Sequence, residues 1–589
     1  MRKITKKIIA LGLSVSIVTT LNGCDTFRKT NQGKTNLSWY MKTTDDNENP
    51  YKLGGKGVVT AVALEDRYSE QYAIVQDNQV FLNISMVQKE VDPRFYWNEK
   101  SKKIMFTNAQ KIYESEINTD KIGNEKVSFI TGILDKDQCY VNAEFVKRYV
   151  DYSFEYIKEK NGTPARVVMT YRPGEVSVMT VDEDMEMRTG GDYQNLIVTT
   201  VPEDSKVTVI EESKNWNLVR TKDGMIGYMP VSSLTEKKRE KRSFKSDEGE
   251  YTHQLMDGKV SMVWHLLTQM AANASLSNKL ENVKGLNVIS PTWFSLKDGK
   301  GNVESIASAE YVQTAHNANL QVWGVISDLD TQGKKNIGKV LKSNQARRKM
   351  VSDLISYAQV YQMDGINVDF EMISEKVSQD YLQFLRELSI QCRQKGLVLS
   401  VDNYVPSAST DYYDRKQQGM LADYIIVMSY DEHATSEDGA GSVSSLGYTE
   451  QSIKDTVEQV GDASRVINGM PFYTTAWIET PVDQSDGSGT LISDSVNGDY
   501  YLTSQDISMD TATELYKKAG STPVFDDNTG QNQVSYQKGD KFVTIWLEDE
   551  TSVKSRLELM NQYKLGGAAY WSLGQESGKI WSVIQSYFK

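Results

Sequence analysis

Over residues 258–589 the chain repeats one pattern, in which a short apolar run is followed by a longer segment with helical periodicity. Each run has the length of one buried strand. Eight strands that alternate with helices favour a closed (β/α)8 barrel, also called a TIM barrel, which is an α/β fold. The runs are VSMVWHLL, LNVISPTWF, LQVWGVIS, GINVDFE, LVLSVDNY, YIIVMSY, RVINGMPFYT and GGAAYWSL.

Helical patterns lie on both sides of the fourth run. In residues 343–363 the apolar positions share one helical face. The next helix is expected to start near Ser374 and to stop at Gly396, a typical C-cap residue. Between the seventh and eighth runs, residues from about 478 to 545 exceed the length of a single crossover helix, so we expect a small α+β insertion there.

The part before the predicted barrel is organised differently. Residues 51–172 carry strand-like runs with interspersed helical patterns, which predicts an α+β module. Residues 176–235 contain five or six short alternating runs and the hairpin-turn sequence Lys222-Asp223-Gly224. The sequence therefore predicts two small modules in front of the barrel.

Two polar stretches are predicted to connect these parts. Residues 24–50 are rich in Asn, Thr, Lys and Asp, which favours a flexible tether. Residues 236–257 contain the charged run EKKREKR, which favours a solvated linker.

The fourth apolar run, DGINVDFE, has a polar residue at every second position. In a strand, successive side chains alternate faces, so Asn367, Asp369 and Glu371 share one face and the apolar residues between them share the other. Bulky apolar side chains normally fill a barrel, so inward polar groups mark a functional site. From these residues alone, a metal pocket and a structural hydrogen-bond network remain alternatives.

Composition narrows the class of ligand. The 589 residues carry a formal net charge of −13, which argues against a nucleic acid partner, since phosphate binding needs clustered positive charge. Neutral carbohydrate is compatible with this balance. The four histidines show no metal-ligand spacing, so we expect no metal and no cofactor. Cys392 lies on an apolar helical stripe and is expected to be a buried, inert thiol.

The first residues, MRKITKKIIALGLSVSIVTTLNGC, combine a basic start with an apolar run that is too short to span a bilayer comfortably. They resemble a bacterial lipoprotein signal, with 1–23 as the signal peptide and LNGC as the lipobox. The resemblance implies lipidation of Cys24 and an extracytoplasmic protein, lipid-anchored to the outer face of the bacterial cell membrane. An ordinary cleaved signal peptide is the alternative.

Four motifs carry a second resemblance. MDGINVDFE, at 363–371, resembles the signature of glycoside hydrolase family 18, the chitinase-like enzymes. MSYD at 428–431, GMPFYTTAW at 469–477 and GGAAYW at 566–571 resemble later motifs of that family, in the family's order. Together with SYDEH and IWLEDETSVKSRL they are most similar to the branch of spore-cortex and cell-wall N-acetylglucosaminidases. The resemblance covers residues 258–589.

The reaction follows partly from the residues and partly from the resemblance. Two carboxyl groups two positions apart on one strand approach a sugar from the same side, so Asp369 is poorly placed as a nucleophile. In the resembled family the substrate's acetamido oxygen attacks instead, with net retention. This implies that Glu371 is the general acid, that Asp369 orients the acetamido N–H, and that Tyr430 donates a hydrogen bond to the acetamido oxygen.

Further residues are assigned by the same resemblance or by their position near the motifs. The expected substrate-binding residues are Asp431, Trp571, Met428, Trp293 and Trp477, and the expected site-support residues are Asp364 and Asn367. Packing in the core is the alternative for each tryptophan. Many chitinases have Asp at the position of Asn367. An asparagine side chain carries no charge, so Asn367 can act only through hydrogen bonds.

The amino-proximal modules also resemble known modules. Residues 51–172 resemble the module named after the N-terminal domain of copper amine oxidases, and no copper is implied. Residues 176–235 resemble a bacterial SH3-like barrel, whose usual marks here are Trp216, Gly224, Gly227 and Tyr228.

These observations predict a membrane-anchored glycosidase that cleaves β-1,4 linkages next to N-acetylglucosamine. Peptidoglycan is the favoured polymer, chitin is the alternative, and a monomer is expected. A carbohydrate-binding wall protein without activity is the rival, because family 18 barrels become lectin-like when the terminal glutamate is lost. The presence of Glu371 together with Asp369 and Tyr430 speaks against that rival.

Overall fold

The computed structural model describes residues 30–244, 251–493 and 498–588. The predicted signal peptide and Cys24 lie outside the described residues. The chain divides into two compact units. The amino-proximal unit comprises 1–53, 58–73 and 152–244, and the barrel unit comprises 54–57, 74–151 and 245–589. These boundaries do not coincide with the expected module of 51–172, most of which belongs to the barrel unit.

The amino-proximal unit contains a seven-stranded antiparallel sheet with the order β15-β14-β18-β17-β16-β13-β19. Its strands are β13 (Gly174–Val181), β14 (Met185–Arg188), β15 (Ile197–Val201), β16 (Lys206–Glu211), β17 (Trp216–Thr221), β18 (Ile226–Pro230) and β19 (Leu234–Arg242). The predicted hairpin turn joins β17 to β18, and Gly224 adopts the left-handed φ of +83° that favours glycine. Elsewhere in the unit, β1 (Val58–Ala63) pairs with β12 (Arg166–Thr170), which pairs with β11 (Ser153–Ile157).

The expected linker begins as a strand. Residues 236–242 belong to β19, which pairs with β13 along most of its length. The prediction was wrong here because backbone hydrogen bonds to a partner strand override the low strand propensity of Lys and Glu. Most side chains of β19 are exposed, and charge on an edge strand discourages pairing with another molecule.

The expected tether is also ordered where it is described. In residues 30–50, helix α1 (Leu37–Tyr40) packs on the sheet, the Tyr40 hydroxyl donates to the Ile226 carbonyl, and Met41 is fully buried in the core of the unit. The flexible tether is therefore wrong for this stretch. Three apolar residues within a polar sequence are enough to dock it.

Residues 74–151 of the barrel unit form small sheets and short helices. The elements are β2 (Ala73–Gln76), β3 (Gln79–Asn83), α2 (Ile84–Met86), β4 (Phe95–Asn98), β5 (Lys103–Thr107), β6 (Ile112–Glu116), β7 (Lys121–Ile122), β8 (Glu125–Lys126), β9 (Gly132–Asp135), β10 (Gln138–Asn142) and α3 (Ala143–Lys147). A buried polar network fastens β4 to the barrel's helices. Arg347 donates to the Tyr96 hydroxyl at 3.1 Å and pairs with Glu387 at 3.0 Å.

The barrel itself has the eight predicted strands, all parallel to their barrel neighbours, and it closes through the pairing of β20 with β21. They are β20 (Val260–His265), β21 (Val288–Leu296), β23 (Gln321–Ser327), β24 (Gly365–Asp369), β25 (Val398–Tyr404), β26 (Tyr424–Met428), β27 (Val466–Pro471) and β34 (Gly567–Trp571). The short strand β22 (Val303–Ser305) pairs with β21 outside the ring. The predicted (β/α)8 barrel is confirmed.

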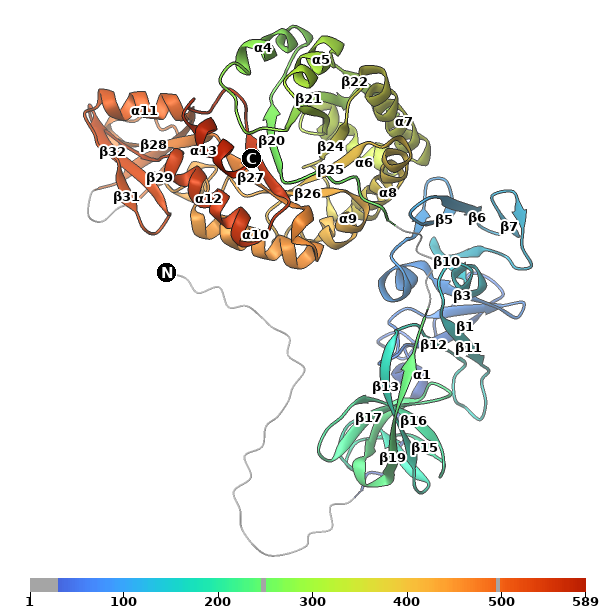
Figure 1. The fold of residues 1–589 in the computed structure, drawn as a ribbon. Coiled ribbons are helices and arrows are strands. Elements are labelled where there is room, and N and C mark those ends of the chain that lie inside the picture. The colour runs from blue at the N-terminus through green and yellow to red at the C-terminus, as the bar shows by residue number, and fades with distance from the viewer. Residues whose placement is uncertain (1–29, 245–250, 494–497, 589) are drawn as a thin grey trace, which may run out of the picture. The chain divides into compact units, whose positions relative to one another are not determined.

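Helices surround the strands (Figure 1). They are α4 (Leu276–Lys279), α5 (Ala309–Asn317), α6 (Thr331–Leu341), α7 (Asn344–Tyr361), α8 (Ser378–Lys395), α9 (Arg415–Leu421), α10 (Leu446–Val460), α12 (Glu550–Gln562) and α13 (Ile580–Tyr587). Helix α8 ends at Gly396, whose φ of +67° makes it the expected C-cap. None of the helices in the described part of the chain is both long and apolar enough to cross a membrane.

Two apolar layers hold the barrel together. The strands' outward residues and the helices form one large core, which includes Ile366, Val368 and Phe370. The inward residues form a second core, in which Trp323 stacks on Tyr424. The barrel is thus packed like an ordinary core except where polar groups replace apolar ones.

A sheet with one helix is inserted between β27 and α12. It comprises β28 (Tyr473–Pro481), β29 (Thr490–Ile492), β30 (Tyr500–Ser508), α11 (Met509–Lys518), β31 (Val524–Asp526), β32 (Gln531–Lys538) and β33 (Lys541–Trp546). The strand order is β29-β30-β28-β33-β32-β31, and Figure 1 shows this sheet beside the barrel. It begins at Tyr473, slightly before the expected boundary near residue 478.

A buried ion pair ties this insertion to the loop that follows β26. Both Arg556 (α12) and Glu548 are almost fully buried, and their closest contact is 2.6 Å. Arg556 also donates to the carbonyl of Ser444, whose hydroxyl donates to the carbonyl of Ser429 at 2.6 Å. The network therefore supports the backbone next to Tyr430.

We expect Arg556→Ala to lower the free energy of unfolding of the barrel unit by about 3–5 kcal/mol, because it leaves Glu548 buried without its cation. Lys554→Ala is the matched control on the same helix, since Lys554 forms an exposed pair with Glu558 at 3.8 Å. Its effect should stay below about 1 kcal/mol. Urea denaturation of both variants checks this, and equal losses would contradict it.

Candidate active site

The fourth strand carries the inward polar groups as predicted. Asn367 accepts a hydrogen bond from the indole N–H of Trp264, which belongs to the inner core, at 3.1 Å. Asp369 is 6% exposed and lines a pocket at the carboxyl ends of the strands. Glu371 follows two residues later and lines the same pocket. The alternation in the sequence therefore does point these three side chains away from the helical shell.

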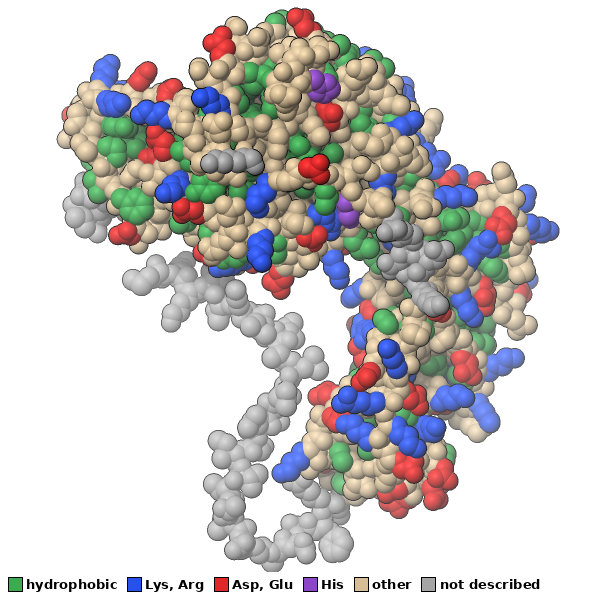
Figure 2. All heavy atoms as spheres, in the orientation of Figure 1, with side chains coloured by type: hydrophobic (Ala, Val, Ile, Leu, Met, Phe, Trp, Pro, Cys, Tyr) green, Lys and Arg blue, Asp and Glu red, His purple; other side chains and the backbone are tan. Residues whose placement is uncertain are grey.

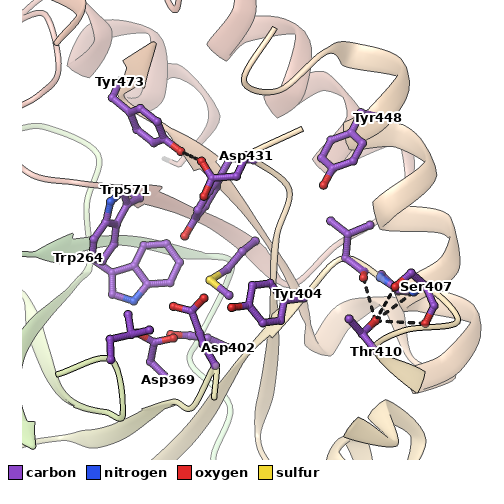
Figure 3. A pocket seen from close by; sticks show the side chains of 16 residues that line it. Trp264, Asp369, Asp402, Tyr404, Ser407, Thr410, Asp431, Tyr448, Tyr473 and Trp571 are labelled. Carbon is purple, nitrogen blue, oxygen red and sulfur yellow. Dashed lines mark hydrogen bonds between the residues drawn. The ribbon is translucent and has the colours of Figure 1, made fainter. Parts of the chain in front are cut away.

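The pocket has a volume of about 660 Å³ and is lined by carboxyl groups and aromatic rings (Figure 3). Its lining residues are Trp264, Leu329, Asp369, Glu371, Asp402, Tyr404, Val405, Pro406, Ser407, Thr410, Met428, Tyr430, Asp431, Tyr448, Tyr473 and Trp571. A pocket of this size with a few convergent polar groups suits part of an oligosaccharide.

Glu371 lies in surroundings that raise its pKa. Its backbone N–H donates to Asp328 Oδ1 at 2.8 Å, which fixes the turn after β24. Burial raises the pKa of Glu371, while a hydrogen bond with the Tyr404 hydroxyl lowers it in part. A carboxyl group whose pKa is raised stays protonated closer to neutral pH, as a general acid requires.

Asp369 is surrounded by other acids. Burial raises its pKa well above the ordinary value, and the charges of Asp402, Glu371 and Asp328 raise it further. Burial also raises the pKa of Asp402 to about 8 and that of Asp328 to about 6. The pocket floor is therefore an acidic cluster in which several carboxyl groups cannot all be charged.

Asn367 supports this cluster from below. Its amide nitrogen donates to Ser400 Oγ at 2.9 Å and to Asp402 Oδ1 at 2.8 Å. All of its hydrogen-bonding partners are buried side chains. The residue thus holds strands β20, β24 and β25 in register at the level of the site.

Residues after β26 form the opposite wall. The hydroxyl pKa of Tyr430 is raised well above its usual value by burial, and its ring lies 6.4 Å from that of Tyr473. Asp431 adopts a φ of +60° and accepts a hydrogen bond from the Tyr473 hydroxyl, which Figure 3 shows as a dashed line. Met428 lines the same wall.

Trp571 closes the pocket from the last strand. Its ring meets that of Trp264 edge-on, with the centroids 5.9 Å apart. Both indoles line the pocket. They form an apolar surface on which a sugar ring can stack.

Three predicted site residues lie elsewhere. Trp293 is 2% exposed and its indole N–H donates to Asn273, whereas Trp477 is 1% exposed and donates to the Gly441 carbonyl. Neither lines the pocket, so for both rings the alternative of core packing agrees with the structure. Asp364 precedes β24 and accepts hydrogen bonds from Val322 N and His316, at the end of the strand away from the pocket.

Sequence reasoning missed Asp402, Tyr404 and Asp328. A signal for the first two was present, because LVLSVDNY has polar residues at alternate positions, as the fourth run does. Asp328 directly follows β23 and had no such signal. No group of three or more His, Cys, Asp or Glu side chains within 30–244, 251–493 and 498–588 is arranged to hold a metal ion.

An acid-lined pocket at the carboxyl ends of a (β/α)8 barrel is the arrangement that barrel glycosidases use. The family model for "Glycosyl hydrolases family 18" matches residues 270–576, which is more than half of the chain. The chain belongs to glycosyl hydrolase family 18 and is a chitinase-like glycosidase.

Several proteins are similar to this chain. It is 28% identical to "Uncharacterized glycosylase YvbX" of Bacillus subtilis (strain 168), over 51% of this chain and 84% of that protein. It is 22% identical to "Cortical fragment-lytic enzyme" of the same organism, over 46% of this chain and 61% of that protein, which is less than two thirds of its length. "Chitinase B" of Serratia marcescens is 21% identical over 46% of this chain and 68% of its own.

Among solved structures, the Bacillus cereus spore cortex-lytic enzyme SleL superposes with a TM-score of 0.49 and 20% sequence identity. The match covers 56% of this chain and 75% of that one.

We expect Tyr404→Phe to shift the alkaline limb of the pH–activity profile upward. The hydrogen bond from Tyr404 lowers the pKa of Glu371, so without it Glu371 stays protonated to higher pH. The profile of kcat/KM against pH measures this. Tyr412→Phe is the control, because that hydroxyl donates to the backbone carbonyl of Ile373 at 2.8 Å, and its profile should match the wild type. A downward shift with Tyr404→Phe would contradict the assignment.

Proposed function

We propose that this chain is an exported glycosidase that cleaves β-1,4 linkages next to N-acetylglucosamine in peptidoglycan. The observation that carries the proposal is the pairing, in one pocket, of Glu371 with the buried Asp369, which lies two residues before it at the end of β24. The names of the relatives support the polymer, since similar proteins of Bacillus subtilis, Bacillus anthracis and Bacillus cereus are named cortical fragment-lytic enzymes. Figure 2 shows acidic and basic side chains interspersed on the visible face, which suits a largely neutral glycan strand better than a polyanion.

The proposed reaction uses the substrate's own acetamido group. Glu371 gives its proton to the glycosidic oxygen, which then leaves with the aglycone. Asp369 projects from the same wall as Glu371, so it cannot attack the anomeric carbon from the opposite face. The acetamido oxygen makes that attack and closes an oxazolinium ring, and Asp369 accepts the acetamido N–H. Water then opens the ring with net retention, and Glu371 takes up a proton from it.

The remaining wall residues position the sugar in this proposal. The Tyr430 hydroxyl donates to the acetamido oxygen, and Asp431, held by Tyr473, accepts from a sugar hydroxyl. Trp571 provides the stacking surface, and Met428 adds an apolar side chain to the lining of the pocket. These groups come from the end of β26, the start of β28 and the end of β34, so the site depends on the closed barrel.

The proposal extends to location and to the other modules. The lipobox sequence supports export and lipid anchoring through Cys24 at the outer face of the cell membrane. The antiparallel sheet with its β17–β18 hairpin supports an SH3-like module at 176–235. The likeness of 51–172 to the copper amine oxidase N-terminal module rests on sequence alone.

Incubating the protein with purified peptidoglycan and, separately, with chitin oligomers tests the substrate. We expect new reducing ends from peptidoglycan, with the products identified by mass spectrometry. If the protein cleaves chitin oligomers faster than peptidoglycan, chitin replaces peptidoglycan as the proposed substrate. The anomeric configuration of the first product, read by NMR before mutarotation, should be that of the substrate. An inverted product would exclude the acetamido mechanism.

Glu371→Gln separates catalysis from binding. The amide keeps the shape of the side chain but cannot donate an acid proton, so turnover should fall by about 10²–10⁴-fold. Binding of an N-acetylglucosamine oligomer, measured by calorimetry, should change little. If wild type and Glu371→Gln bind alike and neither releases reducing ends, the protein is a carbohydrate-binding barrel.

A further inference from the structure

A second carboxyl group lies beside Asp369. Strands β24 and β25 are parallel neighbours with Val368 opposite Val401, so Asp369 and Asp402 are the next pair along the register. Adjacent strands lie about 4.8 Å apart. Figure 3 shows the two carboxyl groups next to each other at the floor of the pocket, below Trp264. Asp402 lines the pocket although it is only 2% exposed, so nearly all of its surface is covered by neighbouring side chains.

Each of these carboxyl groups has a buried oxygen that lacks a hydrogen-bond partner among the described residues. The atoms are Asp369 Oδ1 and Asp402 Oδ2. Two ionised carboxylates at this separation and depth would repel strongly, and each unpaired oxygen would be costly. One proton held between the two groups removes both costs.

Asn367 determines which residue can hold that proton. Because its Oδ1 accepts from the Trp264 indole, its amide nitrogen must face Asp402. Asn367 lies on the same strand as Asp369, but it has no carboxyl group and so cannot share a proton with Asp369. The acidic partner of Asp369 therefore comes from the neighbouring strand.

We propose that Asp402 shares one proton with Asp369 and carries it when Asp369 accepts the acetamido N–H of the substrate. Asp402 acts through Asp369, so it is a positioning residue for the reaction and does not touch the reacting atoms. This inference rests on the function proposed above. The inference gives Asp402 on β25 a role in holding a proton, and this residue lies outside the sequence motif on β24.

The surroundings favour a single shared proton. The charged groups that act on the pair are acids, while the Asn367 amide and the Trp264 indole donate hydrogen bonds to Asp402, and Lys334 acts on the neighbouring Glu371. The titratable groups around the pair are Glu371, Asp328, Tyr404, Tyr430 and, from α8, Tyr381. The pKa of Asp402 is raised to about 8 and that of Asp369 well above its ordinary value, so below about pH 8 the pair holds at least one proton.

The wild-type protein provides the first test. Glu371 must hold one proton and the Asp369–Asp402 pair another, so kcat/KM should fall with the first power of proton concentration and then, at a pH above about 8 where the pair gives up its last proton, with its second power. The substrate is whichever oligosaccharide the wild type cleaves. A profile that follows only the first power up to the pH where the protein unfolds would overturn the proposal.

Variants give the second test. Asp402→Asn should lower kcat by roughly tenfold or more with little change in KM. It should also abolish the second-power region, which is the part of the pH profile where kcat/KM falls with the second power of proton concentration. Moving the carboxyl group back to β24, in the double variant Asn367→Asp with Asp402→Asn, should recover at least about tenfold of kcat and restore that region. A purely structural role for Asp402 predicts no recovery and an unchanged profile.

Asp423→Asn is the matched control. Asp423 is a buried aspartate at the other end of the same strands, where its carboxyl group accepts from Leu399 N and Gln254 N, both at 2.7 Å. This variant should lose stability in a thermal melt but keep the wild-type pH profile. If it loses the second-power region too, that region reports general destabilisation, and the proposal fails.

A measurement without substrate separates this inference from the proposed function. Infrared titration of the free protein should show the stretch of a protonated carboxyl group that persists to at least about pH 8, and its frequency should shift in Asp402→Asn because Asp369 no longer shares its proton. If the wild type cleaves neither peptidoglycan nor chitin oligomers but shows this band, the proposed function fails while the shared proton stands. If the band is missing from the wild type, the shared proton is excluded whatever the activity.

Discussion

The structure depends on one constraint: carboxyl groups buried in a closed barrel must be neutralised, shared or hydrogen-bonded. Asp369 and Asp402 are each almost completely buried on adjacent strands. Water cannot solvate these carboxyl groups there, so surrounding side chains must provide the hydrogen bonds that offset the free-energy cost of burying them. The hydrogen bonds among Trp264, Asn367 and Asp402 meet part of that cost, and burial raises the pKa of the neighbouring Glu371 as well.

The barrel meets this constraint by dividing its interior into two levels. Towards the amino ends of the strands, the inner core is apolar, with Trp323 stacked on Tyr424. Towards the carboxyl ends, Asn367 bridges three strands and the acids begin. Burial of apolar side chains at the first level stabilises the barrel. This stabilisation offsets the cost of burying carboxyl groups with raised pKa values at the second level.

The loops and the insertion complete what the strands begin. Asp431 is oriented by the Tyr473 hydroxyl from the first strand of the insertion. The loop after β26 is held by Arg556, which forms two hydrogen bonds with the buried Glu548 and also donates to the carbonyl of Ser444. A family 18 barrel thus gains a pocket wall from segments that lie far apart in the sequence.

The sequence by itself determined the eight-stranded barrel and the inward direction of Asn367, Asp369 and Glu371, because periodicity is a local property that strand geometry translates directly into faces. It did not reveal that Asp402 lies beside Asp369, that Trp293 and Trp477 lie away from the pocket, or that residues 236–242 form a strand. Each of these depends on a neighbour distant in the chain. Such contacts, and the pKa values that follow from them, arise only when the barrel closes and the sheets pair.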